Sequence, residues 1–205
     1  MNRKKTGKIF ISLGILLIFA AASLFAFNMH LQKKGEENRK KVMEHLLEEI
    51  DNNQTDENIV KPIDSIVDDK ERTINDSVIV DGILYIGYIS IPSLDIEMPV
   101  SKEWDGSLLN MGACRYKGST YQDDLVVCAH NYYTYFANIY KLSGGDEVIF
   151  TDIYGEKITY IVSYQEVVNG KDIKGMITKS DDWDLTLFTC TMSGLTRTTV
   201  RCKRK

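Results

Sequence analysis

The 205-residue sequence has little histidine, proline or cysteine and no excess of basic residues. Its 25 Lys and Arg against 29 Asp and Glu give a formal net charge of -4, so no global positive field favours nucleic-acid binding. Three prolines, 14 glycines and 43% hydrophobic residues exclude collagen-like, mucin-like and wholly disordered chains. Four cysteines are too few for a disulfide scaffold, and no internal repeat indicates a solenoid or propeller.

Histidine is also too scarce for a typical metal site. The chain has three histidines, of which only His130 lies in the β-rich C-terminal part, and no two cysteines show C-x-x-C spacing. Asp123 and Asp124 precede His130 and are interpreted as a solvated acidic turn rather than cation ligands. We therefore predict no metal and no cofactor.

An apolar run over residues 9–27 has no charged side chain and, at about 1.5 Å per residue, is long enough to cross a bilayer. Basic residues precede it, so residues 1–8 are expected to stay cytoplasmic and the remainder to lie outside. We predict a single-pass anchor in the cell membrane. A cleaved signal peptide is the alternative, because three alanines at 20–22 offer a cleavage site.

Residues 28–80 are predicted to be a helical stalk and linker. Within 31–50, apolar residues such as Val42, Leu46 and Ile50 recur at helical spacing and predict an amphipathic helix, interpreted as a spacer that can also self-associate. Residues 51–80 are rich in Asp and Asn without sustained periodicity, which is typical of a linker.

Residues 81–205 have the texture of an all-β domain with minor helices. Short β-branched and aromatic runs alternate with turn residues, which favours a barrel or a sandwich, and a closed barrel removes exposed strand edges. Short helices are expected only near residues 133–140 and 170–178. The expected strands lie at 83–91, 125–128, 147–151, 158–164, 185–190 and 198–202.

The remaining chemistry points to a nucleophile and a base. Cys190 ends an apolar strand, and His130 stands about 60 residues earlier, a pair compatible with thiolate attack on a carbonyl. A hairpin after Cys190 would place Arg197 opposite the cysteine.

These residues carry a resemblance to a known family. Thr186-Leu187-Phe188-Thr189-Cys190 followed by Arg197 resembles the T-L-x-T-C plus Arg signature of sortases. The stretch Val126-Val127-Cys128-Ala129-His130-Asn131 resembles their histidine signature, and the order of His, Cys and Arg agrees. The similarity covers roughly residues 81–202 and implies a closed sortase-type barrel of about eight strands behind a membrane anchor and stalk.

The resemblance implies a membrane-anchored cysteine transpeptidase on the outer face of a Gram-positive type cell. Its expected partners are proteins with an LPxTG-like C-terminal sorting signal, cleaved between Thr and Gly, and an amine of peptidoglycan. The expected catalytic residues are Cys190, His130 and Arg197, with roles as nucleophile, general acid and base, and oxyanion donor. The expected substrate-binding residues are Asn131, Thr189 and Tyr132.

Several alternatives stay open at the level of sequence. Arg201 rivals Arg197, since both lie on one face of a strand. Cys128 is either a small buried residue or a neighbour of the active site, and Cys114, Cys128 and Cys202 allow several disulfide pairings.

The subclass and the reaction outcome also have alternatives. The absence of a second anchor and of an Asp-Pro-aromatic lid motif favours a wall-anchoring over a pilin-polymerising sortase. Release of the product to water would make the protein a cysteine peptidase, and loss of activity would leave a membrane-tethered binding module.

Overall fold

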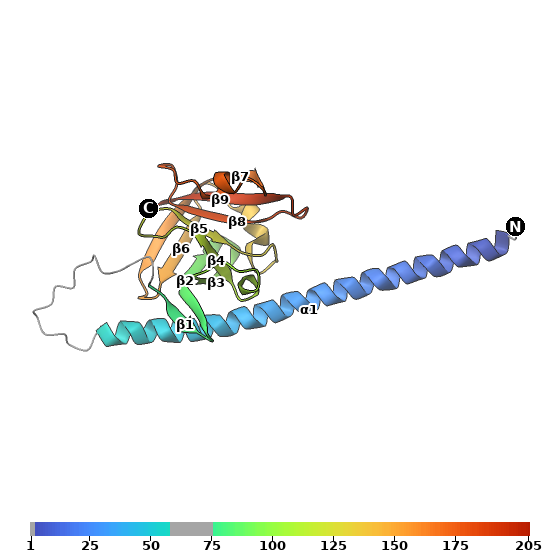
Figure 1. The fold of residues 1–205 in the computed structure, drawn as a ribbon, viewed down its shortest axis with the longest axis horizontal. Helices are drawn as coiled ribbons and strands as arrows, with labels where there is room; N and C mark the ends of the chain where they lie inside the picture. The colour runs from blue at the N-terminus through green and yellow to red at the C-terminus, as the bar shows by residue number, and fades with distance from the viewer. Residues whose placement is uncertain (1–2, 58–75) are drawn as a thin grey trace, which may run out of the picture. The chain divides into compact units, whose positions relative to one another are not determined.

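The computed structural model describes residues 3–57 and 76–205. Helix α1 (Arg3–Glu57) includes the predicted anchor and the first part of the predicted stalk (Figure 1). Its apolar segment is long and hydrophobic enough to cross a membrane, and the large apolar side chains from Phe10 to Phe27 are exposed. This exposed apolar helix is a candidate for a membrane anchor.

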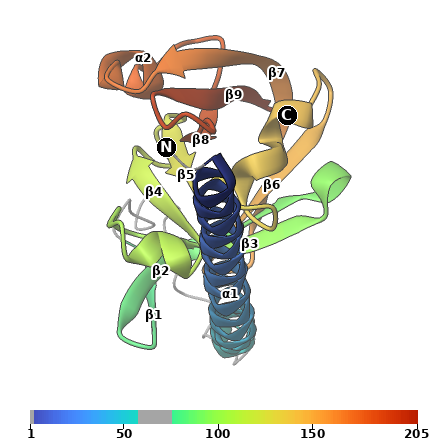
Figure 2. The same ribbon diagram turned by 90° about the vertical axis from the view of Figure 1, so that its right-hand side faces the viewer.

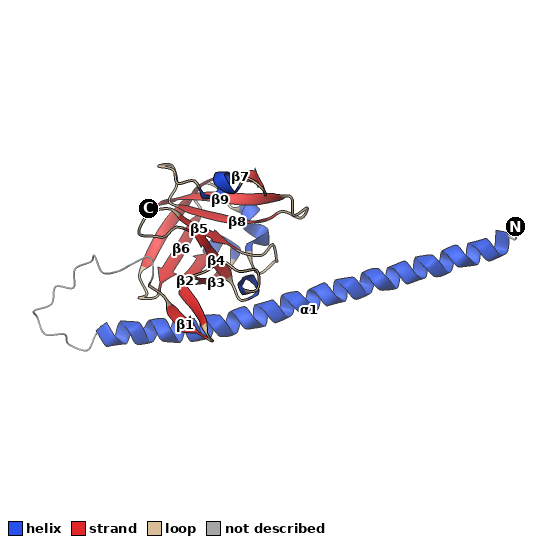
Figure 3. Ribbon diagram, viewed as in Figure 1, coloured by secondary structure: helices blue, strands red, loops and turns tan. Residues whose placement is uncertain are grey.

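The C-terminal part is a closed barrel in which eight strands form a ring (Figure 3). Pairing between β2 and β6 closes it, and β3–β4 and β5–β8 are the parallel neighbours. The predicted all-β barrel of about eight strands is therefore confirmed. The ring runs in the order β2 (Ile83–Ile91), β3 (Ile96–Ser101), β4 (Ala113–Lys117), β5 (Leu125–Cys128), β8 (Leu185–Cys190), β9 (Thr196–Arg204), β7 (Lys157–Asn169) and β6 (Glu147–Asp152).

A ninth strand, β1 (Val78–Val80), pairs only with β2 and forms a hairpin with it. Strands β1, β3 and β4 were not among those expected from the sequence. The two short helical segments that were expected are present as η3 (Phe136–Lys141) and α2 (Ile173–Ile177), and α2 lies on the β7, β8 and β9 side of the barrel (Figure 2). Two further turns of 3-10 helix, η1 (Pro92–Leu94) and η2 (Leu108–Asn110), flank β3.

Closure of the barrel depends on a glycine. Gly87 has a φ of +138°, and a Cβ at this position would lie 2.0 Å from the carbonyl oxygen of Thr151 on β6. A side chain here would therefore push β2 away from β6.

Side chains that alternate along the strands build two apolar clusters, one on each face of the sheet. The inner cluster fills the barrel and includes Leu125, Val127, Leu185 and Leu187. The outer cluster is formed by the outward face of β4, β5 and β8 together with residues of β7 and α2. Its members are Cys114, Val126, Cys128, Val168, Met176 and Phe188.

A third cluster joins the C-terminal part of α1 to the β1–β2 hairpin. Val42, Leu46 and Ile50 are buried against Val80 and Tyr85. The helical spacing predicted this apolar face, and the structure supplies its partner. This part of α1, which belongs with the barrel in one compact unit from Asn38 onward, is therefore more than a spacer.

Candidate active site

Cys190 is positioned by the alternation of β8. Leu185 and Leu187 point into the barrel, whereas Phe188 belongs to the outer cluster, so Cys190 continues the outward face at the end of the strand. Cys190 is exposed to solvent, whereas the other three cysteines are buried. An exposed thiol at a strand end is accessible to a substrate.

His130 follows β5, which runs parallel to β8 and pairs Cys128 with Phe188. The same parallel alignment brings the end of β5 beside the end of β8. The buried Thr189 hydroxyl fastens the two ends, because it donates a hydrogen bond to the carbonyl oxygen of Ala129 at 2.8 Å. Cys190 and His130 are the next residues after Thr189 and Ala129, so this hydrogen bond holds the two catalytic candidates side by side.

Arg197 lies directly opposite Cys190 in the antiparallel β8–β9 register, as the predicted hairpin requires. Its Nη1 donates to the carbonyl oxygens of Gly194, at 2.9 Å, and Thr196, at 3.0 Å. Gly170 provides the space for this guanidinium, since a Cβ there would come within 2.9 Å of Nη1. Sequence reasoning did not identify Gly170, because its neighbour is distant in the chain.

Arg201, the alternative arginine, is held in a different setting. Only 1% of it is exposed. It pairs with Glu166 at 2.8 Å, donates to the Thr186 hydroxyl at 2.8 Å, and lies 4.5 Å from the ring centre of Trp183. Two carbonyl oxygens of α2 accept its remaining hydrogen bonds. These contacts engage the whole guanidinium in packing and leave Arg197 as the arginine beside Cys190.

The His130 imidazole stacks on the ring of Tyr132, with ring centroids 4.6 Å apart and an interplanar angle of 29°. Burial lowers the pKa of His130 below its ordinary value, because the charged imidazolium is poorly solvated. The neutral, proton-accepting form is therefore favoured at neutral pH.

Two hollows border the outward face. The Cys190 hollow is formed by the end of β8, η3 and the following hairpin, and includes Asn131, Asn138, Tyr140, Met192 and Thr198. Its edge is closed by the Asn131 amide, which donates to the Met192 sulfur at 3.8 Å.

The outer hollow lies beside the outer cluster, between the β3–η2 loop, β4 and α2. It is lined by Trp104, Tyr116 and Ile177 among others. The rings of Trp104, Tyr116 and Phe188 make successive edge-to-face contacts at 5.8 and 5.2 Å. The hollow combines these aromatic and apolar side chains with the charged side chains of Lys102, Glu103, Arg115 and Lys117.

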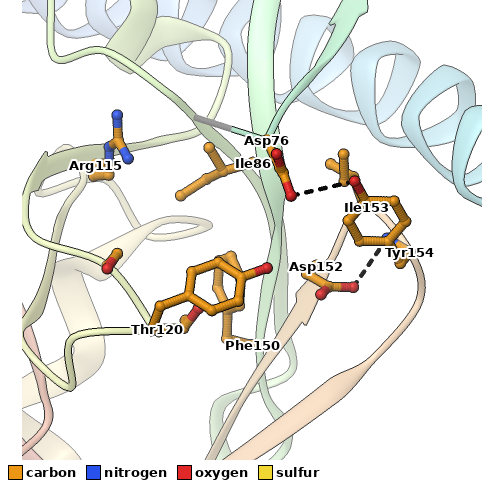
Figure 4. A pocket seen from close by; sticks show the side chains of 10 residues that line it. Asp76, Ile86, Arg115, Thr120, Phe150, Asp152, Ile153 and Tyr154 are labelled. Carbon is orange, nitrogen blue, oxygen red and sulfur yellow. Dashed lines mark hydrogen bonds between the residues drawn. The ribbon is translucent and has the colours of Figure 1, made fainter. Parts of the chain in front are cut away.

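A third pocket is formed by β2, the β4–β5 loop and the β6–β7 turn (Figure 4). The hydroxyl of Tyr154 donates to Asp76 at 3.2 Å, and its amide donates to Asp152 at 2.9 Å. Neither a cysteine nor a histidine is among its lining residues, so it lacks the thiol and imidazole found at the ends of β8 and β5.

The cysteines fall on different faces. Cys202 belongs to the inner cluster, whereas Cys114 and Cys128 belong to the outer cluster and are paired directly across β4 and β5. All four cysteines are free. Because the sheet separates Cys202 from the other two, the disulfide pairings that sequence allowed for Cys202 are excluded by this arrangement.

Of the three residues expected to bind substrate, two lie at the site and the third is buried between strands. Asn131 lines the Cys190 hollow, and Tyr132 lies against His130. The Thr189 side chain is buried and bonded to Ala129, so it joins two strands instead of facing a ligand.

A closed barrel that presents a cysteine, a histidine and an arginine together on the outward ends of adjacent strands defines the class of protein. A family model of the sortase domain matches residues 89–205. The chain therefore belongs to the sortase family, a family of cysteine transpeptidases. No curated protein sequence matches the chain.

Solved sortase structures share this fold. The chain is similar to sortase C1 of GBS Pilus Island 1, with 26% identity and a TM-score of 0.51 over 59% of this chain and 64% of that one. It is also similar to sortase C1 from Streptococcus suis, with 26% identity and a TM-score of 0.50 over 59% and 73%. Sortase C from Clostridium perfringens SM101 has 22% identity and a TM-score of 0.52 over 90% and 98%, which shows the shared fold.

The chain thus spans just under two thirds of the length of the GBS sortase C1. These three neighbours are all sortases of type C. The expectation of a wall-anchoring subclass was based on sequence features alone and stays a prediction.

Proposed function

We propose that this sortase is a cysteine transpeptidase in which Cys190 is the nucleophile, His130 the general acid and base, and Arg197 the oxyanion donor. The observation that carries the proposal is the placement of these three side chains on neighbouring strand ends of a sortase barrel. Tight packing of Arg201 against Glu166 and Trp183 supports Arg197 for the third role.

The first step forms a thioester. His130 takes the proton of the Cys190 thiol, and the resulting thiolate attacks the carbonyl carbon of the Thr-Gly bond. The C–N bond breaks, and the protonated His130 gives that proton to the departing amine. The guanidinium of Arg197 donates to the oxygen that becomes negative in the tetrahedral intermediate, an interaction worth roughly 3 kcal/mol. In the second step an acceptor amine attacks the thioester, His130 accepts its proton, and the thiolate leaves.

The proposed substrate is an LPxTG-like sorting signal lying on the outward face of β5 and β8. Phe188 precedes Cys190 by two residues on that face, so the outer cluster leads along β8 to the thiol. Apolar residues of the signal fit the outer hollow, where the exposed Trp104 ring and the neighbouring Tyr116 ring provide contact area.

The Cys190 hollow then lies on the other side of the thiol, and we assign it to the acceptor amine of peptidoglycan. Its Asn131 and Asn138 amides and exposed Tyr140 ring suit a peptide or a sugar, because amides pair with polar groups and an aromatic face packs on a sugar ring. Residues 9–27 serve in this proposal as the membrane anchor, with residues 1–8 cytoplasmic, 28–80 as stalk and linker, and the catalytic part, 81–205, outside the cell.

The test is the fate of the peptide. The full chain in detergent is incubated with LPxTG-like peptides and an amine such as triglycine. The products are separated by chromatography, and their masses are measured by mass spectrometry. A product ending in Thr–triglycine supports transpeptidation, whereas free Thr carboxylate alone supports the hydrolase alternative. No cleavage of any peptide by a folded chain would reject the enzyme and leave a tethered binding module.

Two matched variants sharpen the assay. Arg197→Lys keeps the charge but removes the fork-shaped donor, and should reduce kcat far more than KM. Lys157→Ala removes an exposed cation at the start of β7, at the opposite end of this strand from the Arg197 hairpin, and should leave turnover near the wild-type value.

A further inference from the structure

Two contacts between aromatic rings and one cation–π contact connect His130 to helix α1. His130 stacks on Tyr132 at 4.6 Å, and Tyr132 makes an edge-to-face contact with Tyr135, with centroids 5.8 Å apart and planes at 86°. The guanidinium carbon of Arg39, on α1, lies 5.9 Å from the centre of the Tyr135 ring. The series therefore runs from the helix to the histidine without a gap.

Further contacts hold Tyr135 and Arg39, the two members of this series that are nearest to the helix. Tyr135 is fully buried, and its hydroxyl donates to the carbonyl oxygen of Asn110 at 3.0 Å. The loop itself is a tight turn, in which the Tyr135 amide donates to the Tyr132 carbonyl oxygen at 2.9 Å. Arg39 is held in turn by a hydrogen bond from Nη1 to the carbonyl oxygen of Glu97 on β3.

We infer that Arg39 is a positioning residue for His130, acting through the rings of Tyr135 and Tyr132. The inference rests on the proposed function, in which His130 moves the proton. Arg39 attracts the face of the Tyr135 ring and orders it. Tyr135 then supports the edge-to-face contact of Tyr132, and Tyr132 sets the plane of the imidazole.

The consequence is that α1 contributes to the catalytic site as well as to anchoring. The cluster of Val42, Leu46 and Ile50 holds the helix on the β1–β2 hairpin. Arg39 lies one turn before that cluster, so the docked helix presents its guanidinium to the His130 loop.

The primary test is the NMR signal of the His130 ring in the full chain, labelled at histidine and held in nanodiscs. Signals are assigned with His30→Gln and His45→Gln variants. An imidazole stacked on an aromatic ring has its ring protons shifted upfield, so Tyr132→Leu should move the His130 signals downfield. Tyr132→Phe keeps the ring and should leave them near the wild-type position.

The decisive variant is Arg39→Gln, for which we expect a smaller downfield shift of the His130 signals and partial restoration in Arg39→Lys. Lys41→Gln is the matched control, because it removes an exposed cation from the same helix, and it should leave His130 unchanged. If Arg39→Gln leaves the His130 signals at the wild-type position while Tyr132→Leu moves them, the inference is overturned.

Kinetics give a second readout. Arg39→Gln and Tyr132→Leu should lower kcat, by about tenfold for Tyr132→Leu, with little change in KM, because a misplaced base slows proton transfer without weakening binding. A rise in KM at constant kcat would contradict positioning. Absence of turnover in the wild-type chain would reject the proposed function alone, since the NMR shifts do not depend on activity.

Discussion

The contact between α1 and the β1–β2 hairpin predicts that Leu46→Ala destabilises the barrel. Leu46 is 0% exposed and lies in a cluster with Val42, Ile50, Val80 and Tyr85. Truncating a fully buried leucine costs about 2–5 kcal/mol, and a site between one helix and a hairpin can partly collapse, so we expect about 3 kcal/mol.

Leu47→Ala is the matched control. Leu47 is the next residue on the same helix and is 42% exposed, so its truncation should cost less than about 1 kcal/mol. Both substitutions replace leucine with alanine in a helix, and the difference in helix propensity therefore cancels.

Urea unfolding of the full chain in detergent measures both variants. Trp104 and Trp183 are the only tryptophans and both lie in the barrel part, so their fluorescence reports barrel unfolding. With a urea m-value of about 1–3 kcal/mol/M, the Leu46→Ala midpoint should fall by at least about 1 M. Equal midpoints for the two variants would show that the helix is only a spacer.

Further predictions concern the site. Arg201→Ala should lower the free energy of unfolding by at least about 3 kcal/mol, measured in urea, because it leaves the buried partners of a nearly inaccessible guanidinium unsatisfied. Thr189→Val should cost about 1–2 kcal/mol, with Thr189→Ser close to the wild type, since the Ala129 carbonyl loses its hydrogen bond. The folded-state pKa of His130 lies below 6.5, so stability should be lost as the pH falls from about 6.5 through that folded pKa, and thermal melts of His130→Gln should lack this part of the loss.

Much of the barrel could be predicted from the pattern of β-branched and aromatic residues in the sequence. The runs that became β2, β5 and β8 alternate or concentrate β-branched and aromatic residues, and their predicted limits agree with the structure. Strands β3 and β4 lack this pattern, because Pro99 and Glu97 interrupt the first and the second is Ala-Cys-Arg-Tyr-Lys. Their strand state depends on neighbours in the sheet, which sequence periodicity does not contain.

The site was predictable where local geometry decides it. A hairpin after Cys190 places Arg197 opposite it, and the observed β8–β9 register does pair these two residues. The buried role of Arg201 depends on Trp183 and Glu166, which lie far away in sequence. The contact of Arg39 with the His130 loop likewise requires the packing of α1 on the barrel.

The role of Cys190 as nucleophile is tested most directly by the mass of the enzyme itself during turnover. The full chain is mixed with an LPxTG-like peptide without an amine, quenched in acid, digested and sequenced by mass spectrometry. We predict a thioester of the peptide's acyl part on Cys190, which disappears when triglycine is added before the quench. An adduct on another residue, or cleavage that persists in Cys190→Ala, would contradict this prediction.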